Sequence, residues 1–219
     1  MTQFEITGAA RIGFIKATYP LVSLSVTPTR LEVNASIAGN LVFQPKDIVK
    51  IEPFKHSYFP GRGIQIVHKV GNYTKKVFFG AKEDPETLVQ RIKQTGFLNN
   101  QDHVSLEEKK DIVSRQEQGS FPIKKQFALG FLLGWNALFV MHLFPFVKNA
   151  LPGFSVVSSI GLSALILFLV SLISLYSPEF RRLYLKHGRT LKDIKKFLIL
   201  TLIISGLMAA NAVFLFFIL

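Results

Sequence analysis

The sequence predicts an α+β protein in two parts: an antiparallel β barrel closed by one helix, then an all-α region of three transmembrane helices. Two observations predict this class. Short segments in which apolar and polar residues alternate fill residues 9–80. Three long charge-free runs fill the C-terminal part, and such runs are typical of membrane-spanning helices. We therefore expect a domain over 1–98, a connector over 99–125 and a transmembrane region over 126–219.

The first part has the pattern of short strands that follow one another along a sheet. Leu24 and Val26 alternate with serines, and Leu31 and Val33 repeat the alternation after a turn at residues 27–29. An alternation with a period of two places one face of each strand in a core. The close spacing of turn signals favours an antiparallel meander that curls into a barrel or a sandwich.

One helix is predicted over 84–96, after the last strand. Asp84 is a favourable N-cap, and Pro85 occupies the first helical position, where its missing N–H costs nothing. Gly96 ends the helix. We expect the open end of the barrel to cover the apolar stripe of this helix, which is formed by Leu88, Val89 and Ile92.

The order of four segments in this part resembles the pleckstrin-homology-like barrel, GRAM-type modules included, of small bacterial membrane proteins. The segments are ATYPLVSLSVTPTRLEV, VFQPKDIVKIE, GRGIQIVH and DPETLVQRIKQTGF. The resemblance covers about residues 8–98 and implies a PH-like domain with a C-terminal capping helix. The helix lacks the tryptophan of familiar PH domains, and the first hairpin offers Arg30 in place of a basic cluster. Phosphoinositide binding is therefore not expected.

The polar connector is predicted to be partly helical. Ser105 and Glu108 have the spacing of a capping box, which predicts a short helix over 106–118. Gly119 and Pro122 end it. The connector is thus not expected to be a flexible tether.

The predicted spans are residues 126–147, 154–176 and 197–219. As a helix rising about 1.5 Å per residue, the second would be roughly 34 Å long, enough to cross a hydrocarbon core of about 30 Å. Asn136, His142 and Asn211 are expected to form inter-helix hydrogen bonds. Small residues at helical spacing are expected to pack the helices of one chain, with a dimer face as the alternative; they are Gly130, Gly134, Ser155, Ser159, Ser163, Gly206 and Ala210.

The formal net charge of +12 is distributed in a way that favours a membrane over nucleic acid as the partner. The β part is thinly basic, whereas the segment 177–196 is densely basic. An anionic cytoplasmic leaflet attracts basic residues that flank spans. Ser177 and Pro178 start a short helix that we expect to lie at the interface. The basic residues of this segment are Arg181, Arg182, Lys186, Arg189, Lys192, Lys195 and Lys196.

The basic residues also predict the topology. Lys124 and Lys125 precede the first span, whereas the turn at 148–153 is poor in basic residues and none follows Phe197. Short basic segments are retained on the cytoplasmic side. We expect a multi-pass protein of the cell membrane, with a cytoplasmic N-terminal domain and an outside C-terminus. The first span is the least hydrophobic; if it lay on the surface, both termini would share a side.

No catalytic, metal or cofactor site is predicted, so we expect a protein that is not an enzyme. The chain has no cysteine, its histidines show no ligand spacing, and no nucleophile–base pair is visible. The candidate site is a weakly basic patch for anionic lipid or a protein partner, with a merely solvated face as the alternative. Its residues are Lys55, Arg62, Lys69, Lys75 and Lys76.

The leading hypothesis is a membrane-anchored binding or adaptor module that contacts membrane lipid or an unknown protein, with self-association as an option. The alternative is an accessory subunit of a membrane transport or channel complex. Charged residues inside the spans would support that alternative, and the predicted spans have none.

Overall fold

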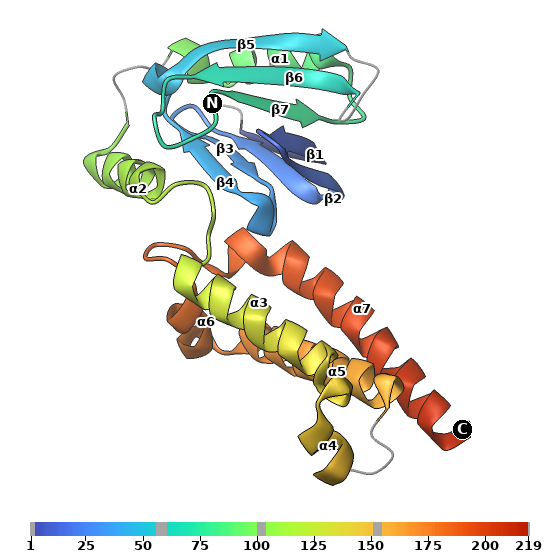
Figure 1. The fold of residues 1–219 in the computed structure, drawn as a ribbon. Coiled ribbons are helices and arrows are strands. Elements are labelled where there is room, and N and C mark those ends of the chain that lie inside the picture. The colour runs from blue at the N-terminus through green and yellow to red at the C-terminus, as the bar shows by residue number, and fades with distance from the viewer. Residues whose placement is uncertain (1–2, 56–60, 100–103, 151–154, 219) are drawn as a thin grey trace. The chain divides into compact units, whose positions relative to one another are not determined.

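The computed structural model describes residues 3–55, 61–99, 104–150 and 155–218. The chain forms two compact units, Met1–Pro122 and Ile123–Leu219. The described strands all lie in the first unit, and the second is helical (Figure 1). This confirms the α+β class. The sequence also predicts a Pro/Gly-rich loop at 56–63; its residues 56–60, and residues 151–153 of the predicted turn at 148–153, lie outside the described residues. Residues 148–150 of that turn belong to the helix α4 (Pro145–Ala150).

A seven-stranded antiparallel sheet forms the body of the first unit, with the order β4-β3-β2-β1-β7-β6-β5. β1 pairs with both β2 and β7, so it joins the hairpins on its two sides. The sheet is antiparallel and curled as predicted, but it is not a single meander, because β4 and β5 are consecutive in the chain and lie at opposite edges. The strands are β1 (Phe4–Ile12), β2 (Ile15–Val26), β3 (Leu31–Asn34), β4 (Asn40–Phe43), β5 (Ile48–Lys55), β6 (Arg62–His68) and β7 (Lys76–Gly80).

Most of β1 was missed by the sequence analysis, which placed the first strand signal at Ala9. Phe4, Ile6 and Thr7 favour a strand, but Gly8 interrupts the pattern with a residue that strands disfavour. Gly8 is nevertheless required for packing, because a Cβ there would meet the Gly80 carbonyl oxygen and the ring of Phe79. The central strand β1 therefore needs a residue without a side chain at Gly8, where its neighbour β7 passes closely.

The predicted helix after the sheet is confirmed as α1 (Pro85–Gln94). The Asp84 carboxylate accepts hydrogen bonds from the backbone N–H groups of Glu86 and Thr87. Gly96 has φ +78°, a left-handed conformation that favours glycine after a helix. The apolar stripe of α1 packs on β5 and β6 and belongs to the same buried core as the inner face of the sheet.

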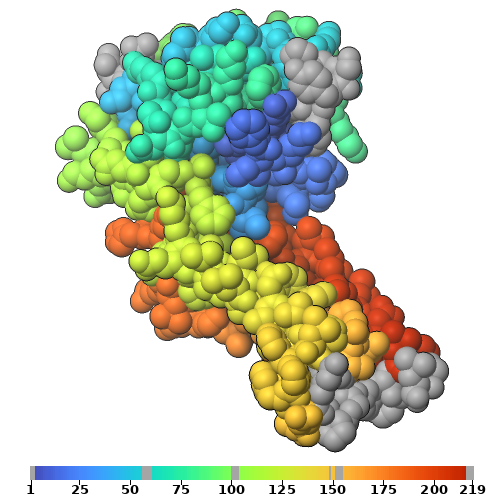
Figure 2. Space-filling view, viewed as in Figure 1, coloured from blue at the N-terminus to red at the C-terminus, as the bar shows by residue number. Residues whose placement is uncertain are grey.

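The predicted connector helix is confirmed as α2 (Leu106–Glu117), with the Ser105 hydroxyl accepting from the N–H of Glu108. It belongs to the first compact unit and is no separate linker. Ile112 is fully buried and α2 packs on β4. In Figure 2 the yellow-green atoms of α2 lie directly against the blue and teal atoms of the strands.

The second unit is built around two long apolar helices, α5 (Val156–Tyr176) and α7 (Leu191–Ile218). Within the described residues these are the two helices that are long and apolar enough to cross a membrane. They support membrane association. The other helices are α3 (Lys125–Phe139), η4 (Met141–Leu143), α4 (Pro145–Ala150) and α6 (Pro178–Tyr184).

The prediction of one continuous helical span over 126–147 is wrong. α3 has 15 residues, which at about 1.5 Å per residue extend roughly 22 Å, short of a hydrocarbon core of about 30 Å. The residue before Pro145 is Phe144, and its φ −75° and ψ 128° are extended. A residue that precedes proline avoids the helical region, so the helix must end before it. The region has two candidate spanning helices in place of three.

Candidate membrane-contact site

The turn between β1 and β2 exposes two large apolar side chains. Gly13 has φ +61° and takes the first position of the two-residue turn, where such hairpins favour glycine. Phe14 follows it and is 99% exposed, and Ile15 is 52% exposed. We call Phe14 and Ile15 the apolar tip. A single exposed apolar side chain is common, so the informative feature is that two adjacent large apolar side chains share one exposed turn.

Basic side chains surround the apolar tip. Lys16 is exposed and directly follows it, while the Arg11 Nε donates to the carbonyl oxygen of Gly13 at 3.1 Å. The pairing of Ile12 with Val77 brings the start of β7, with the exposed Lys75 and Lys76, to the same end of the sheet. The arrangement combines an apolar group with cations, which suits a surface of anionic headgroups above an apolar layer.

The chain also leaves the first unit at this end of the sheet. The backbone N–H of Asn40 donates to the carbonyl oxygen of Ser120 at 2.8 Å. A Cβ on Gly39 would meet both the Ser120 side chain, at 3.2 Å, and the Ile12 side chain, at 3.3 Å. Ser120 therefore lies beside the strand end that carries the apolar tip. The helices that can enter a membrane follow Ser120 in the chain.

The five residues of the predicted basic patch are divided between two ends of the sheet. Lys55 pairs with Arg62 across β5 and β6, and the Lys55 ammonium is 3.5 Å from the Glu86 carboxylate. Lys69, Lys75 and Lys76 lie at the other end of β6, beyond the seven residues of that strand. A seven-residue strand extends about 23 Å at 3.3 Å per residue. The structure thus brings three of the five together and keeps two apart.

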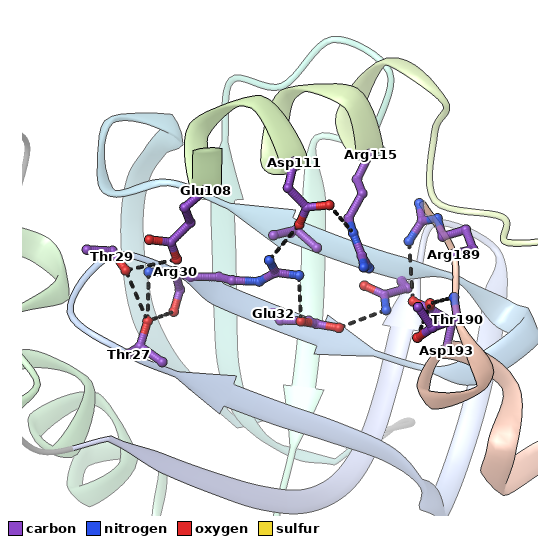
Figure 3. Close-up of polar contacts among 12 residues, drawn as sticks. Thr27, Thr29, Arg30, Glu32, Glu108, Asp111, Arg115, Arg189, Thr190 and Asp193 are labelled. Atoms are coloured by element: carbon purple, nitrogen blue, oxygen red, sulfur yellow. Dashed lines mark hydrogen bonds and ion pairs between the residues drawn. The ribbon is translucent and has the colours of Figure 1, made fainter. Parts of the chain in front are cut away.

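A polar network holds α2 on the sheet and so fixes the path of the chain toward Ser120 (Figure 3). The Arg30 guanidinium donates to Glu32 and to Asp111, each at 2.9 Å. The Thr29 hydroxyl donates to Glu108 at 3.0 Å. Burial opposes ionisation of Asp111, but hydrogen bonds and charge from Arg30 and Arg115 outweigh it and lower the pKa of its carboxyl. Glu108 therefore contacts the sheet and not its own helix N-terminus.

The predicted basic segment follows α5. The Arg181 guanidinium donates to the carbonyl oxygens of Ser174 and Leu175 at the end of α5. Arg189 is buried and its Nη1 is 3.6 Å from the Asp193 carboxylate. Lys192 and Lys195 are exposed. Asp193 also accepts from the N–H of Thr190, as expected for the cap of α7 (Figure 3).

The predicted small residues divide into those that pack helices and those that do not. Ser159 and Ser163 are fully buried, and Gly206 lies where a Cβ would approach the Phe168 ring at 3.2 Å. No described atom lies within 4 Å of a Cβ placed on Gly130 or Gly134, and Ala210 is exposed. Ser155 is the N-cap of α5. The sequence analysis missed Gly161, where a Cβ would lie 2.8 Å from that of Ala212.

The polar residues of the first apolar run form two different kinds of hydrogen bond. The Asn136 amide donates to the carbonyl oxygen of Leu132, within its own helix, at 2.7 Å. His142 forms the expected inter-helix contact, because its Nδ1 lies 3.2 Å from the Ser159 hydroxyl oxygen, which also accepts from the His142 backbone N–H at 3.1 Å. The Trp135 indole adds another, to the carbonyl oxygen of Ser163 at 3.2 Å.

No family model, curated protein or solved structure matches this chain. Among the described residues, no three histidine or carboxylate side chains are grouped so that they could hold a metal ion. The apolar tip is the site that sequence analysis missed. The sequence analysis includes Phe14 in the strand-forming region 9–80, although Gly13 before it is a turn signal.

Proposed function

We propose that the protein is a non-enzymatic, membrane-anchored binding module whose PH-like β unit contacts an anionic bilayer surface. The apolar tip carries this proposal, because it joins exposed apolar area to basic side chains at the end where the chain leaves the unit. The two apolar helices α5 and α7 support the anchor. The membrane lipid is thus the first partner of the β unit, and a protein partner would bind on its remaining surface.

The strength of the contact fits a tethered domain. Burial of a phenylalanine side chain contributes about 1.5–3 kcal/mol. Each basic group near an anionic surface adds about 1 kcal/mol. Such a sum is modest for a free domain, but a tether raises the effective concentration of the domain at the membrane. The contact would therefore orient the β unit, while the helices retain it at the bilayer.

Contacts inside the second unit support a topology. The backbone N–H of Lys124 donates to the carbonyl oxygen of Tyr184, so α3 begins beside the segment that follows α5. The contacts of Trp135 with Ser163 and of His142 with Ser159 show that α3 and η4 run along α5 toward its start. We infer that α3, η4 and α4 together carry the chain across the membrane to the side on which α5 begins, in place of one continuous helical span.

This path gives the β unit and the basic segment one side of the membrane, and the C-terminus the other. The basic segment would lie on the cytoplasmic side, where Lys and Arg are retained. The α-helical hydrogen bonding is interrupted on both sides of the 3-10 turn η4, at Val140 and at Phe144. Such an interruption is tolerated at membrane depth only where protein groups satisfy the freed backbone. The hydrogen bond from the N–H of His142 to Ser159 is consistent with that requirement.

The first prediction tests the apolar tip with a fluorescent label. The chain has no cysteine, so Phe14→Cys can carry a single environment-sensitive dye on the full-length protein in nanodiscs. We expect a blue-shifted emission in nanodiscs that contain phosphatidylglycerol. High salt should reverse the shift, because salt screens exposed charges. Replacement of Lys75 and Lys76 by Glu should reduce the blue shift.

Thr87→Cys provides the matched control, because Thr87 is exposed at the start of α1, beside the Glu86 that pairs with Lys55. Its dye should report water in every nanodisc. Equal emission from the two labelled positions, with or without anionic lipid, would exclude membrane contact by the apolar tip.

A further inference from the structure

A basic cavity of about 560 Å³ lies in the second unit, between the end of α5 and the start of α7. This volume is in the range of about 300–1,000 Å³ that is typical of small-molecule sites. None of the described residues that line it is acidic. Its basic lining residues are Lys124, Arg181, Arg182, Lys186, His187 and Arg189.

The walls of the cavity are fixed by local structure. The Ser177 hydroxyl accepts from the N–H of Phe180 and so caps α6. Leu185 then forms an antiparallel bridge with Ile123. Gly188 has φ +71° and turns the chain back toward α7, which a residue with a Cβ would do only with strain. The cavity is therefore a defined pocket between ordered elements.

Lys124, Arg181 and Arg189 are among the basic side chains of the lining that contact protein groups. The Lys124 ammonium donates to the carbonyl oxygens of Arg182 and Leu183, at 2.9 and 2.8 Å. Arg181 contacts the end of α5, and Arg189 pairs with Asp193. Those contacts hold the side chains in place, but the carbonyl groups carry no net charge to balance Lys124. Hydrogen bonds from the backbone and Ser177, together with the charges of Arg182 and Arg181, lower the pKa of the exposed Glu179 carboxyl, so Glu179 offsets part of the charge of these two arginines. The five Lys and Arg residues of the lining still outnumber the two neighbouring carboxylates, Glu179 and Asp193.

Repulsion inside the cavity is visible at Lys186. This lysine is half-buried, and burial together with the charges of Arg189 and Lys125 lowers the pKa of its ammonium. The negative charge of a bound anion would offset both effects on this pKa, because an opposite charge nearby favours the protonated form. Arg182, next to the cavity mouth, is exposed and can turn toward such an anion.

The position of the cavity-lining residues in the sequence places them at the expected level of the lipid headgroups. The charge-free α5 ends at Tyr176, and the apolar part of α7 follows Lys196. The cavity residues from Pro178 to Leu191 lie between these two apolar stretches. If α5 and α7 enter a bilayer, basic residues at this position meet its polar surface, and basic pockets there bind anionic headgroups.

We propose that this cavity binds a phosphate anion, through guanidinium and ammonium donors supplied by the basic segment. The phosphate could belong to the headgroup of an anionic phospholipid or to a free phosphate ion, and the chemistry of recognition is the same. Arginine is suited to this role because its planar donors match phosphate oxygens. The proposal is independent of the β unit, since every lining residue lies in the second unit.

The second prediction tests this site on the full-length protein with two probes. Retention of phosphatidylglycerol is measured by native mass spectrometry, and inorganic phosphate is titrated onto protein in phosphatidylcholine nanodiscs. The variant Arg182→Gln/Lys186→Gln should weaken binding of at least one probe by about tenfold or more, because each charge-assisted hydrogen bond is strong. Loss of lipid retention alone assigns a headgroup; loss of phosphate binding alone assigns the free ion.

The control variant Lys192→Gln/Lys195→Gln removes the same charge from exposed positions of the same segment that do not line the cavity. It should retain the binding of wild type. Equal loss in both variants, or no specific binding of either probe to wild type, would overturn the proposal.

A measurement on unmodified protein covers the case in which the cavity variant does not fold. The rate of acetylation of Lys186 should fall when the bound probe is added, while the rates at Lys192 and Lys195 change little. Unchanged acetylation of Lys186 with both probes would refute the site without any substitution.

Discussion

At the scale of single residues, His68 links pH to the stability of the β unit. Its ring is buried; Nε2 lies 2.7 Å from the carbonyl oxygen of Thr74, and Nδ1 accepts from the N–H of Val70. This pattern requires the neutral ring, since protonated Nδ1 cannot accept. Burial lowers the pKa of His68, although the contact with Thr74 opposes the shift.

The third prediction follows from this shift. Below about pH 6.5 the unfolded chain takes up a proton that the native ring resists. The stabilisation is therefore complete above pH 6.5 and is lost as the pH falls toward the lower pKa of the folded state. His68→Gln should lower the melting temperature at pH 7.5. It should also make the melting temperature depend less on pH between pH 7.5 and 5.5. Parallel pH profiles of the two proteins would contradict this.

Residue-scale prediction from sequence succeeded where a side chain acts on its own backbone. Asp84 and Ser105 cap helices because their oxygens reach N–H groups two or three residues away, and sequence spacing contains that information. It failed at Phe14, whose exposure depends on the pairing of β1 with β2 and β7. Apolar character alone favours a core position, so the sequence analysis did not identify the exposed apolar tip.

At the scale of elements, α2 is held to the sheet by one buried apolar side chain and a polar network. The fourth prediction concerns Ile112→Ala, which should destabilise the docking of α2 by about 2–5 kcal/mol, because it leaves a cavity. Hydrogen exchange should accelerate in α2 and remain slow in β1 and β7. Val113→Ala on the same helix is the control, with an expected cost of about 0.5 kcal/mol or less.

The first apolar run, residues 126–147, shows that apolar content alone does not predict a continuous helix. Residues 126–147 satisfy the composition of a span, but composition does not report whether the backbone hydrogen bonds continue. Pro145 disfavours helical geometry at Phe144, and η4 occupies the residues just before it. The proline was visible in the sequence. The hydroxyl of Ser159, which satisfies the freed N–H of His142, was not identifiable without the fold.

At the scale of the whole molecule, the fifth prediction concerns the side of each terminus. A reporter at Leu219 should be accessible to external protease in intact cells, and one at Met1 should be protected. The reason is the path along α5, which sets the start of α3 and the end of α7 on opposite sides if α5 and α7 cross. Protection of both reporters would indicate that α3 lies on the surface.

The distribution of charge gave the molecule its expected orientation, because the positive-inside rule depends on sequence position alone. The basic cavity could not be predicted in the same way. Lys124 and Arg182 are far apart in the chain and meet only because Ile123 bridges Leu185. A count of basic residues identifies a charged segment, but only tertiary structure forms it into a pocket.

The approach of α5 to α7 at two glycines determines how the helices are aligned lengthwise. The buried hydroxyls of Ser163 and Ser205 donate to carbonyl oxygens of their own helices, so they do not fix one helix against the other. The fit of Gly161 to Ala212 and of Gly206 to Phe168 does fix it. A slide of one turn, about 5.4 Å, would bring larger side chains to both contacts. The lengthwise alignment of α5 and α7 therefore requires the absence of a side chain at Gly161 and Gly206.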